Sequence, residues 1–151
     1  MKNDAISSEL LESLNKASRK IRTAFNQGVT AHGLTYPRAR TLLRLAKKQN
    51  VTQTELACEL ELEQATIVRL LDRMEENGLI ERRADPNDRR VKLIALTEHG
   101  KEQAELVKSI GLQLRMHLFS DIDTQELQSA IDLLEKVSAR LGDWSGDSVT
   151  K

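Results

Sequence analysis

Apolar residues recur at three- and four-residue steps in six stretches of the chain. Between residues 8 and 25, for example, Leu10, Leu14, Ala17 and Ile21 follow this spacing. Because an α-helix turns once every 3.6 residues, such positions fall on one helical face that can be buried. The spacing predicts amphipathic helices over about 8–25, 36–49, 53–60, 63–77, 97–119 and 124–141.

The stretch from Glu63 to Leu96 has the most informative pattern. Ile67, Leu70, Leu71 and Met74 are predicted to form the buried face of one helix. Gly78 follows the last periodic residue and suits a left-handed helix cap. Residues 79–96 then hold two apolar-rich segments on either side of the turn-forming tetrapeptide 85–88, Asp-Pro-Asn-Asp. We therefore predict a helix followed by a two-stranded hairpin.

A shorter helix is predicted directly before this one. Thr52 and Glu55 form a capping box, in which each side chain satisfies a free N–H at the helix start. Glu61 and Leu62 lie between the short helix and the longer helix that Glu63 begins. A short helix, a tight turn and a longer helix are the arrangement of a helix-turn-helix, here over about 53–76. With the hairpin at 79–96 as a wing, the predicted unit is a winged helix-turn-helix.

The expected fold is therefore mainly α with a small β-hairpin wing (α+β). We expect an N-terminal dimerisation helix and connector over 1–33, the DNA-binding unit over 34–96, C-terminal dimerisation helices over 97–141 and a flexible tail over 142–151. A central unit of this size cannot bury the apolar stripes of the first and last two helices. A second copy of the chain, packed about a two-fold axis, is the simplest partner for them.

Charge is distributed unevenly along the chain, although its 151 residues carry no net charge. No Asp or Glu occurs from Ser13 to Thr54, whereas nine Lys and Arg do. From Thr97 to Gly146 the balance reverses, with nine acidic against five basic residues. This asymmetry favours a basic working surface and an acidic body, as in a nucleic-acid-binding protein, over an evenly solvated surface.

Several other classes of protein are disfavoured. Aromatic residues make up only 3% of the chain, too few for a platform that stacks single-stranded bases. No apolar run is long enough for a membrane span, no signal peptide is evident, and the single cysteine forms no internal disulfide, so we expect a cytoplasmic protein. We find no nucleophile–base pair, phosphate loop or metal-ligand spacing, and predict neither an enzyme, a cofactor nor a metal site.

Long or hydrogen-bonding side chains lie off the buried face of the second helix of the motif, where they can contact bases and phosphates. These are Gln64, Thr66, Arg69 and Arg73, although the two arginines could instead form ion pairs with acids on their own helix. Arg89 and Arg90 follow the hairpin turn, where an arginine can enter a narrow minor groove. Asp88 could be a turn former, a partner of Arg90 or both.

The run from Glu63 to Arg82, together with Asp88-Arg89-Arg90 and Leu96-Thr97, resembles the MarR family of bacterial transcription regulators, and within it the SlyA branch. The resemblance extends over about residues 8–141. It implies a homodimer formed by the first and last two helices, an inverted-repeat operator of double-stranded DNA, and a wing in the minor groove. It also implies that small aromatic anions such as salicylate weaken DNA binding, without indicating whether the protein represses or activates.

The resemblance also assigns roles residue by residue. Gln64, Ala65, Thr66 and Arg69 correspond to the face that contacts bases and backbone, Arg90 to the arginine that enters the minor groove, and Asp88 to the acid that orients it. Ala65 stands where the SlyA branch often has proline. For an anion pocket, the basic and aromatic candidates are Arg19, Arg22, Tyr36 and Arg38.

Two alternatives remain at this point. A helical dimer could act as a protein-interaction module or anti-repressor without binding DNA, its uneven charge then steering a protein partner. Cys58, between Ala57 and Leu60, is expected to be a small core or half-buried residue, with a redox-sensing role as the alternative.

Overall fold

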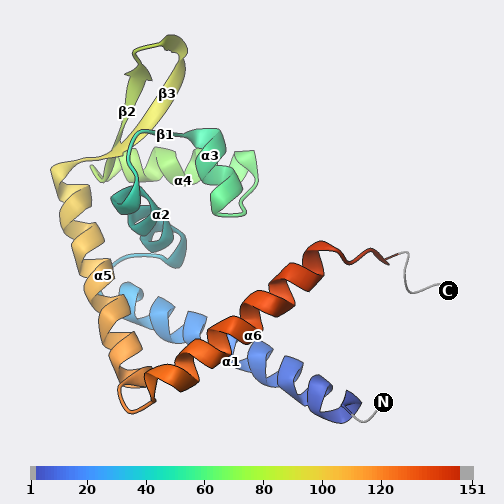
Figure 1. Ribbon diagram of the computed structural model, residues 1–151. Coiled ribbons are helices and arrows are strands. Elements are labelled where there is room, and N and C mark those ends of the chain that lie inside the picture. The colour runs from blue at the N-terminus through green and yellow to red at the C-terminus, as the bar shows by residue number, and fades with distance from the viewer. Residues whose placement is uncertain (1–2, 147–151) are drawn as a thin grey trace. The chain divides into compact units, whose positions relative to one another are not determined.

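The computed structural model describes residues 3–146 (Figure 1). The elements follow in the order α1 (Asp4–Thr30), α2 (Tyr36–Lys47), β1 (Val51–Thr52), α3 (Gln53–Glu59), α4 (Gln64–Glu76), β2 (Ile80–Asp85), β3 (Asp88–Leu96), α5 (Glu98–Phe119) and α6 (Thr124–Gly142). The chain divides into two compact units, the first extending to Leu114 and the second beginning at Arg115. The predicted fold class, a mainly helical winged helix-turn-helix, is confirmed.

The sheet has three antiparallel strands in the order β1-β3-β2, one more than the predicted hairpin. The additional strand is β1, in which Val51 pairs with Ile94 and Thr52 with Leu93. The sequence did not predict β1, because two residues are too few to show the alternation of apolar and polar positions that marks a strand. Its pairing fixes the segment before α3 to the base of the wing, so the wing and the helix-turn-helix share one sheet.

The core of the first unit lies beneath the helix-turn-helix. Its largest fully buried side chains come from α2, α3, α4 and the sheet, and include Leu42, Leu45, Leu56, Ile67, Leu71, Met74 and Ile94. Val29 of α1 and Val107 of α5 complete it. The predicted inner face of α4 is correct except for Leu70, which is only partly buried. Burial of this apolar surface fixes which face of α4 is left for solvent.

The predicted helix boundaries in the motif depend on local hydrogen bonds. Thr52 Oγ1 accepts from the N–H of Glu55 at 3.1 Å and begins α3. After α4, Gly78 has a φ of +74°, and the N–H of Leu79 donates to the Met74 carbonyl at 2.9 Å. This is a Schellman-type cap that needs a left-handed residue, as the sequence indicates. Thr97 Oγ1 then accepts from the N–H of Gly100 at 3.0 Å and begins α5.

The first and last helices contribute few or no side chains to the core. α1 is longer than the predicted 8–25, because the helix runs from Asp4 to Thr30. α6 contains no buried residue, and Ile131, Leu133, Leu134 and Leu141 are exposed. Part of the predicted flexible tail, residues 147–151, lies outside the described residues. Among residues 3–146, no helix is long and apolar enough to cross a membrane.

Candidate nucleic-acid interface

α4 presents a polar face to solvent because its apolar face is held by the core. Ile67, Leu71 and Met74 are buried, while Gln64, Ala65, Thr66, Arg69 and Arg73 are exposed. Neither arginine forms an ion pair within the described residues, so the alternative of partners on their own helix is not realised. The exposed face thus combines uncommitted guanidinium, hydroxyl and amide groups, which can donate to phosphates and base edges.

The tip of the wing is shaped by two aspartates. Asp85 Oδ1 accepts from the N–H of Asn87 at 2.9 Å, which closes the turn between β2 and β3. Asp88 Oδ1 accepts from both the N–H and the Nε of Arg90, at 3.0 and 3.3 Å. Asp88 therefore forms the turn and orients an arginine whose side chain is 91% exposed. Arg89 is also exposed and has no ion pair in the described chain.

Arg82 links the base of the wing to α4. Its Nη2 donates to Asp72 Oδ1 at 2.8 Å and its Nη1 to Glu75 Oε1 at 3.0 Å, and only 20% of its side chain is exposed. Pairing with two acids of α4 neutralises its positive charge. No sequence pattern identifies this link, because it depends on the angle at which β2 leaves α4. It holds the wing and the exposed face of α4 in a fixed relation.

A second ion pair fastens α2 to α3. Arg44 Nη2 donates to Glu59 Oε1 at 2.7 Å. The hydrogen bond to Arg44 lowers the pKa of Glu59, and the same bond to Glu59 raises the pKa of Arg44. Each charge thus favours the ionised form of its partner. The pair links the first helix of the motif to α2 and gives one of the basic residues of α2 an acidic partner.

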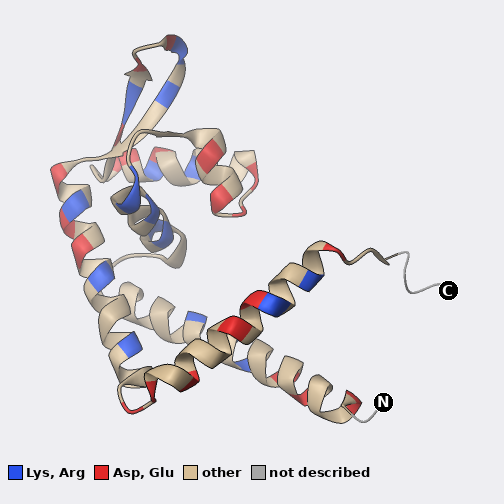
Figure 2. Cartoon of the chain, viewed as in Figure 1, with Lys and Arg blue, Asp and Glu red and all other residues tan. Residues whose placement is uncertain are grey.

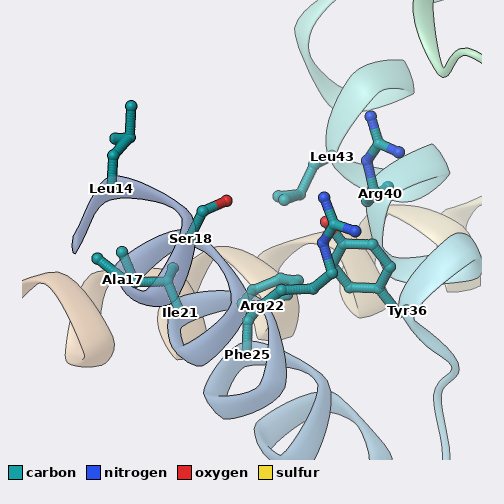
Figure 3. Close-up of a pocket in the computed structure, with 9 residues that line it drawn as sticks. All are labelled: Leu14, Ala17, Ser18, Ile21, Arg22, Phe25, Tyr36, Arg40 and Leu43. Carbon is teal, nitrogen blue, oxygen red and sulfur yellow. The ribbon is translucent and has the colours of Figure 1, made fainter. Parts of the chain in front are cut away.

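A pocket of about 460 Å³ lies between α1 and α2 (Figure 3). Its wall is mostly apolar, with Ile21, Phe25 and Leu43 near Tyr36. The guanidinium carbons of Arg22 and Arg40 lie 5.8 and 5.7 Å from the centre of the Tyr36 ring, within cation–π range. Apolar walls with two guanidinium groups suit a flat aromatic anion.

Of the four residues predicted for an anion pocket, the structure brings together only Arg22 and Tyr36. Arg19 is exposed on α1 and lines a polar groove with Glu12 and Lys16. Arg38 lies beside α4 instead. Arg40, which the sequence reasoning missed, completes the pocket, and its spacing of four residues from Tyr36 on a helix could have identified it.

Cys58 is exposed, which corrects the expectation of a core or half-buried position. Leu56, Ala57 and Leu60 face the core, and at 100° per residue the position between them points outward. Among residues 3–146, no group of three or more His, Cys, Asp or Glu could hold a metal ion.

Basic residues occur on α2 and on the wing, on either side of the helix-turn-helix in the sequence. Figure 2 shows Lys and Arg on α2 and on both strands of the wing. Of the basic residues of α2, Arg38 lies near Arg69 and Arg73 of α4. Basic side chains of two helices gathered in this way are expected of a surface that contacts phosphates.

The comparisons with known proteins agree with this geometry. Residues 34–92 match the sequence model of the MarR family. The uncharacterized HTH-type transcriptional regulator YdgJ of Bacillus subtilis (strain 168) is 25% identical over 129 residues, which cover 85% of this chain and 77% of YdgJ. Among solved structures, the transcriptional regulator PA3341 is 31% identical with a TM-score of 0.79, over 89% of this chain and 99% of that chain. A mutant MarR from E. coli complexed with operator DNA is 26% identical with a TM-score of 0.74, over 89% of this chain and 96% of that chain.

Proposed function

This chain belongs to the MarR family of DNA-binding transcription regulators, and from that premise we propose that it acts as a homodimer on an inverted-repeat operator. In this proposal α4 lies in the major groove and Arg90 enters the adjacent minor groove. The observation that carries it is the exposed polar face of α4, which Arg82 holds in a fixed relation to the wing that presents Arg90. One rigid unit then contacts two adjacent grooves.

The unpartnered apolar residues of α1 and α6 support the dimer. Leu10, Leu11 and Ile21 of α1 are exposed by 43–55%, and Leu134 of α6 is exposed by 41%. Apolar stripes of this kind are costly in water and indicate a partner surface. A two-fold axis also duplicates the helix-turn-helix, so that two copies of α4 can enter successive major grooves about 34 Å apart.

We assign the protein to the SlyA branch on the sequence of α4 and the wing. The assignment would fall if a tree of family sequences placed the chain elsewhere. Because the proposed ligand is double-stranded DNA, we expect the protein to act in the bacterial cytoplasm.

The function is tested by selecting duplexes from a random library with the purified full-length protein. We expect recovered sequences to contain two inverted half-sites and each duplex to bind two subunits, as measured by sedimentation. Affinity should fall steeply with salt, because each neutralised phosphate releases counterions. Failure to retard any duplex at any salt concentration would instead favour the protein-interaction module.

We also propose that a small aromatic anion regulates the protein through the α1–α2 pocket. Its ring would pack among Phe25, Tyr36 and Leu43, and its carboxylate would pair with Arg22 and Arg40. Arg40 Nη1 also donates to the Leu60 carbonyl at 3.4 Å, at the end of α3 just before the turn into α4. A ligand that draws Arg40 into the pocket therefore removes a hydrogen bond from the motif that reads DNA.

Salicylate is expected to weaken operator binding by the wild type by at least about fivefold, the lower range of typical allosteric coupling. Arg22→Ala should abolish this response while leaving DNA affinity without salicylate unchanged, as measured by fluorescence anisotropy of a labelled duplex. Arg19→Ala is the matched control on the same helix outside the pocket, and it should respond as the wild type does. An unchanged salicylate response in Arg22→Ala would show that salicylate does not act through this pocket.

A further inference from the structure

A second groove, of about 550 Å³, lies between the start of α2 and the exposed face of α4. Three arginines line it: Arg38 from α2, and Arg69 and Arg73 one turn apart on α4. The hydroxyl-bearing residues Thr35 and Thr66 lie on the same wall. The groove is separate from the α1–α2 pocket, with which it shares no lining residue.

The three guanidinium groups are not neutralised. Within residues 3–146, none of them pairs with a carboxylate, whereas Arg44, Arg82, Arg83 and Arg90 each do. Like charges gathered around one groove repel each other, and a bound anion relieves that repulsion. Three arginines without a carboxylate partner therefore line a single groove, which distinguishes it from the paired positions at Arg44, Arg82, Arg83 and Arg90.

Arg38 is positioned for such an anion. Its side chain is half-buried, unlike the exposed Arg69 and Arg73, so less of its freedom is lost on binding. Thr35 Oγ1 accepts from the N–H of Arg38 at 3.4 Å and keeps its own proton for donation. Guanidinium forks and a hydroxyl are the donors that bind the oxygens of a phosphate group.

We propose that this groove binds a phosphate group of the DNA backbone and that Arg38 is a DNA-contacting residue rather than part of an effector pocket. The inference rests on the proposed function, since α4 must lie on DNA for a strand to reach the groove. A backbone contact carries no sequence information. Arg38 therefore contributes affinity for every duplex alike, whereas the face of α4 distinguishes one operator from another.

The test compares Arg38→Ala with Lys47→Ala, which removes one exposed positive charge from the other end of α2. Both full-length proteins are titrated with the duplex selected by the wild type, at several salt concentrations. Arg38→Ala is expected to weaken binding about tenfold, equally for selected and unrelated duplexes. It should also reduce the slope of log affinity against log salt by about one for each bound subunit. Lys47→Ala should change both quantities little.

The phosphate itself is located by replacing the phosphates of the duplex one at a time with neutral methylphosphonates. One position per half-site should weaken the wild type but not Arg38→Ala. If every position weakens the two proteins equally, the groove does not hold the strand and the inference is overturned. If inorganic phosphate at constant ionic strength displaces DNA from the wild type only, and no methylphosphonate position distinguishes the variants, the groove is a site for a free anion and the backbone assignment is wrong.

These outcomes separate the inference from the function on which it rests. A wild type that binds its selected duplex, with Arg38→Ala matching Lys47→Ala in affinity and salt slope, contradicts the inference and leaves the regulator intact. A wild type that binds no duplex contradicts both.

Discussion

Replacing Arg90 with alanine is expected to lower operator affinity on the order of 100- to 1000-fold. Its side chain is 91% exposed and is aimed by Asp88 at the tip of the wing. A charged hydrogen bond to a minor-groove acceptor contributes about 2 kcal/mol, and a dimer loses one from each subunit. The change removes no packing contact, so the thermal stability of the free protein should stay the same. Anisotropy titration of the selected duplex at fixed salt measures the affinity.

Two further variants test whether the effect of Arg90→Ala comes from losing a positive charge on the wing or from losing the guanidinium group at this position. Arg83 lies on the same hairpin, but its Nε already donates to Glu81 Oε1 at 2.7 Å. Because Glu81 already offsets this charge in each of the two subunits, we expect Arg83→Ala to lower DNA affinity by less than about tenfold. Arg90→Lys keeps the positive charge but loses the fork that Asp88 orients, and should lie between wild type and alanine. Wild-type affinity in Arg90→Ala at matched salt would exclude the wing from the interface.

Gly100→Ala is expected to destabilise the fold by about 3 kcal/mol, at the upper end of overpacking effects. A Cβ built on Gly100 would lie 2.0 Å from the backbone carbonyl oxygen of Leu79 and 3.2 Å from Leu96 Cδ2. The same oxygen accepts from the N–H of Thr97 at 3.1 Å, so the first turn of α5 rests directly on the base of the wing. No side-chain rotation relieves a clash with backbone, and α5 must move away. Urea denaturation followed by circular dichroism measures the change.

Gly142→Ala provides the control for this substitution. A Cβ at Gly142 meets no atom within 4 Å, and the residue lies at the end of α6, so we expect at most about 1 kcal/mol of stabilisation from alanine's helix propensity. Should Gly100→Ala unfold at the same urea concentration as the wild type, the close approach of α5 to Leu79 would not hold in solution.

The elements that could be predicted from the sequence are those whose signals are local. Thr52 and Gly78 act on backbone groups a few residues away, and the periodicity of Ile67, Leu71 and Met74 lies within one helix. These signals were enough to place the helix-turn-helix and the wing. The exposed face of α4 followed directly, because it is the complement of the buried one.

Features that depend on where elements meet could not be predicted in this way. Pairing of β1 with β3, the bridge from Arg82 to α4, and the close approach at Gly100 all depend on how separate segments of the chain pack together. Glycine generally weakens a helix, but in the structure Gly100 leaves room for the Leu79 carbonyl. Likewise, the sequence does not distinguish Arg22 from Arg38, since both are basic. In the fold, Arg22 lines the α1–α2 pocket, whereas Arg38 lies beside α4.

A consistent division emerges among the arginines of the motif. Arg44 and Arg82 pair with acids of neighbouring elements and hold α3 and the wing in place. Arg38, Arg69 and Arg73 have no acidic partner in the described chain and surround one groove. The two groups of arginines differ in whether an acidic side chain lies beside them. The composition does not show this difference, because Lys and Arg together equal Asp and Glu in number. An arginine without an acidic partner has no ion pair to give up when it binds a phosphate.

The most direct measurement is the affinity of the protein for its inverted repeat before and after five base pairs are inserted between the half-sites. Two symmetry-related copies of α4 would no longer face the same side of the duplex, because five base pairs are about half a helical turn. We predict that affinity falls to that of a single half-site, and that ten inserted base pairs recover part of the loss. Equal affinity for the original and the five-base-pair spacing would show that two subunits do not read the operator together.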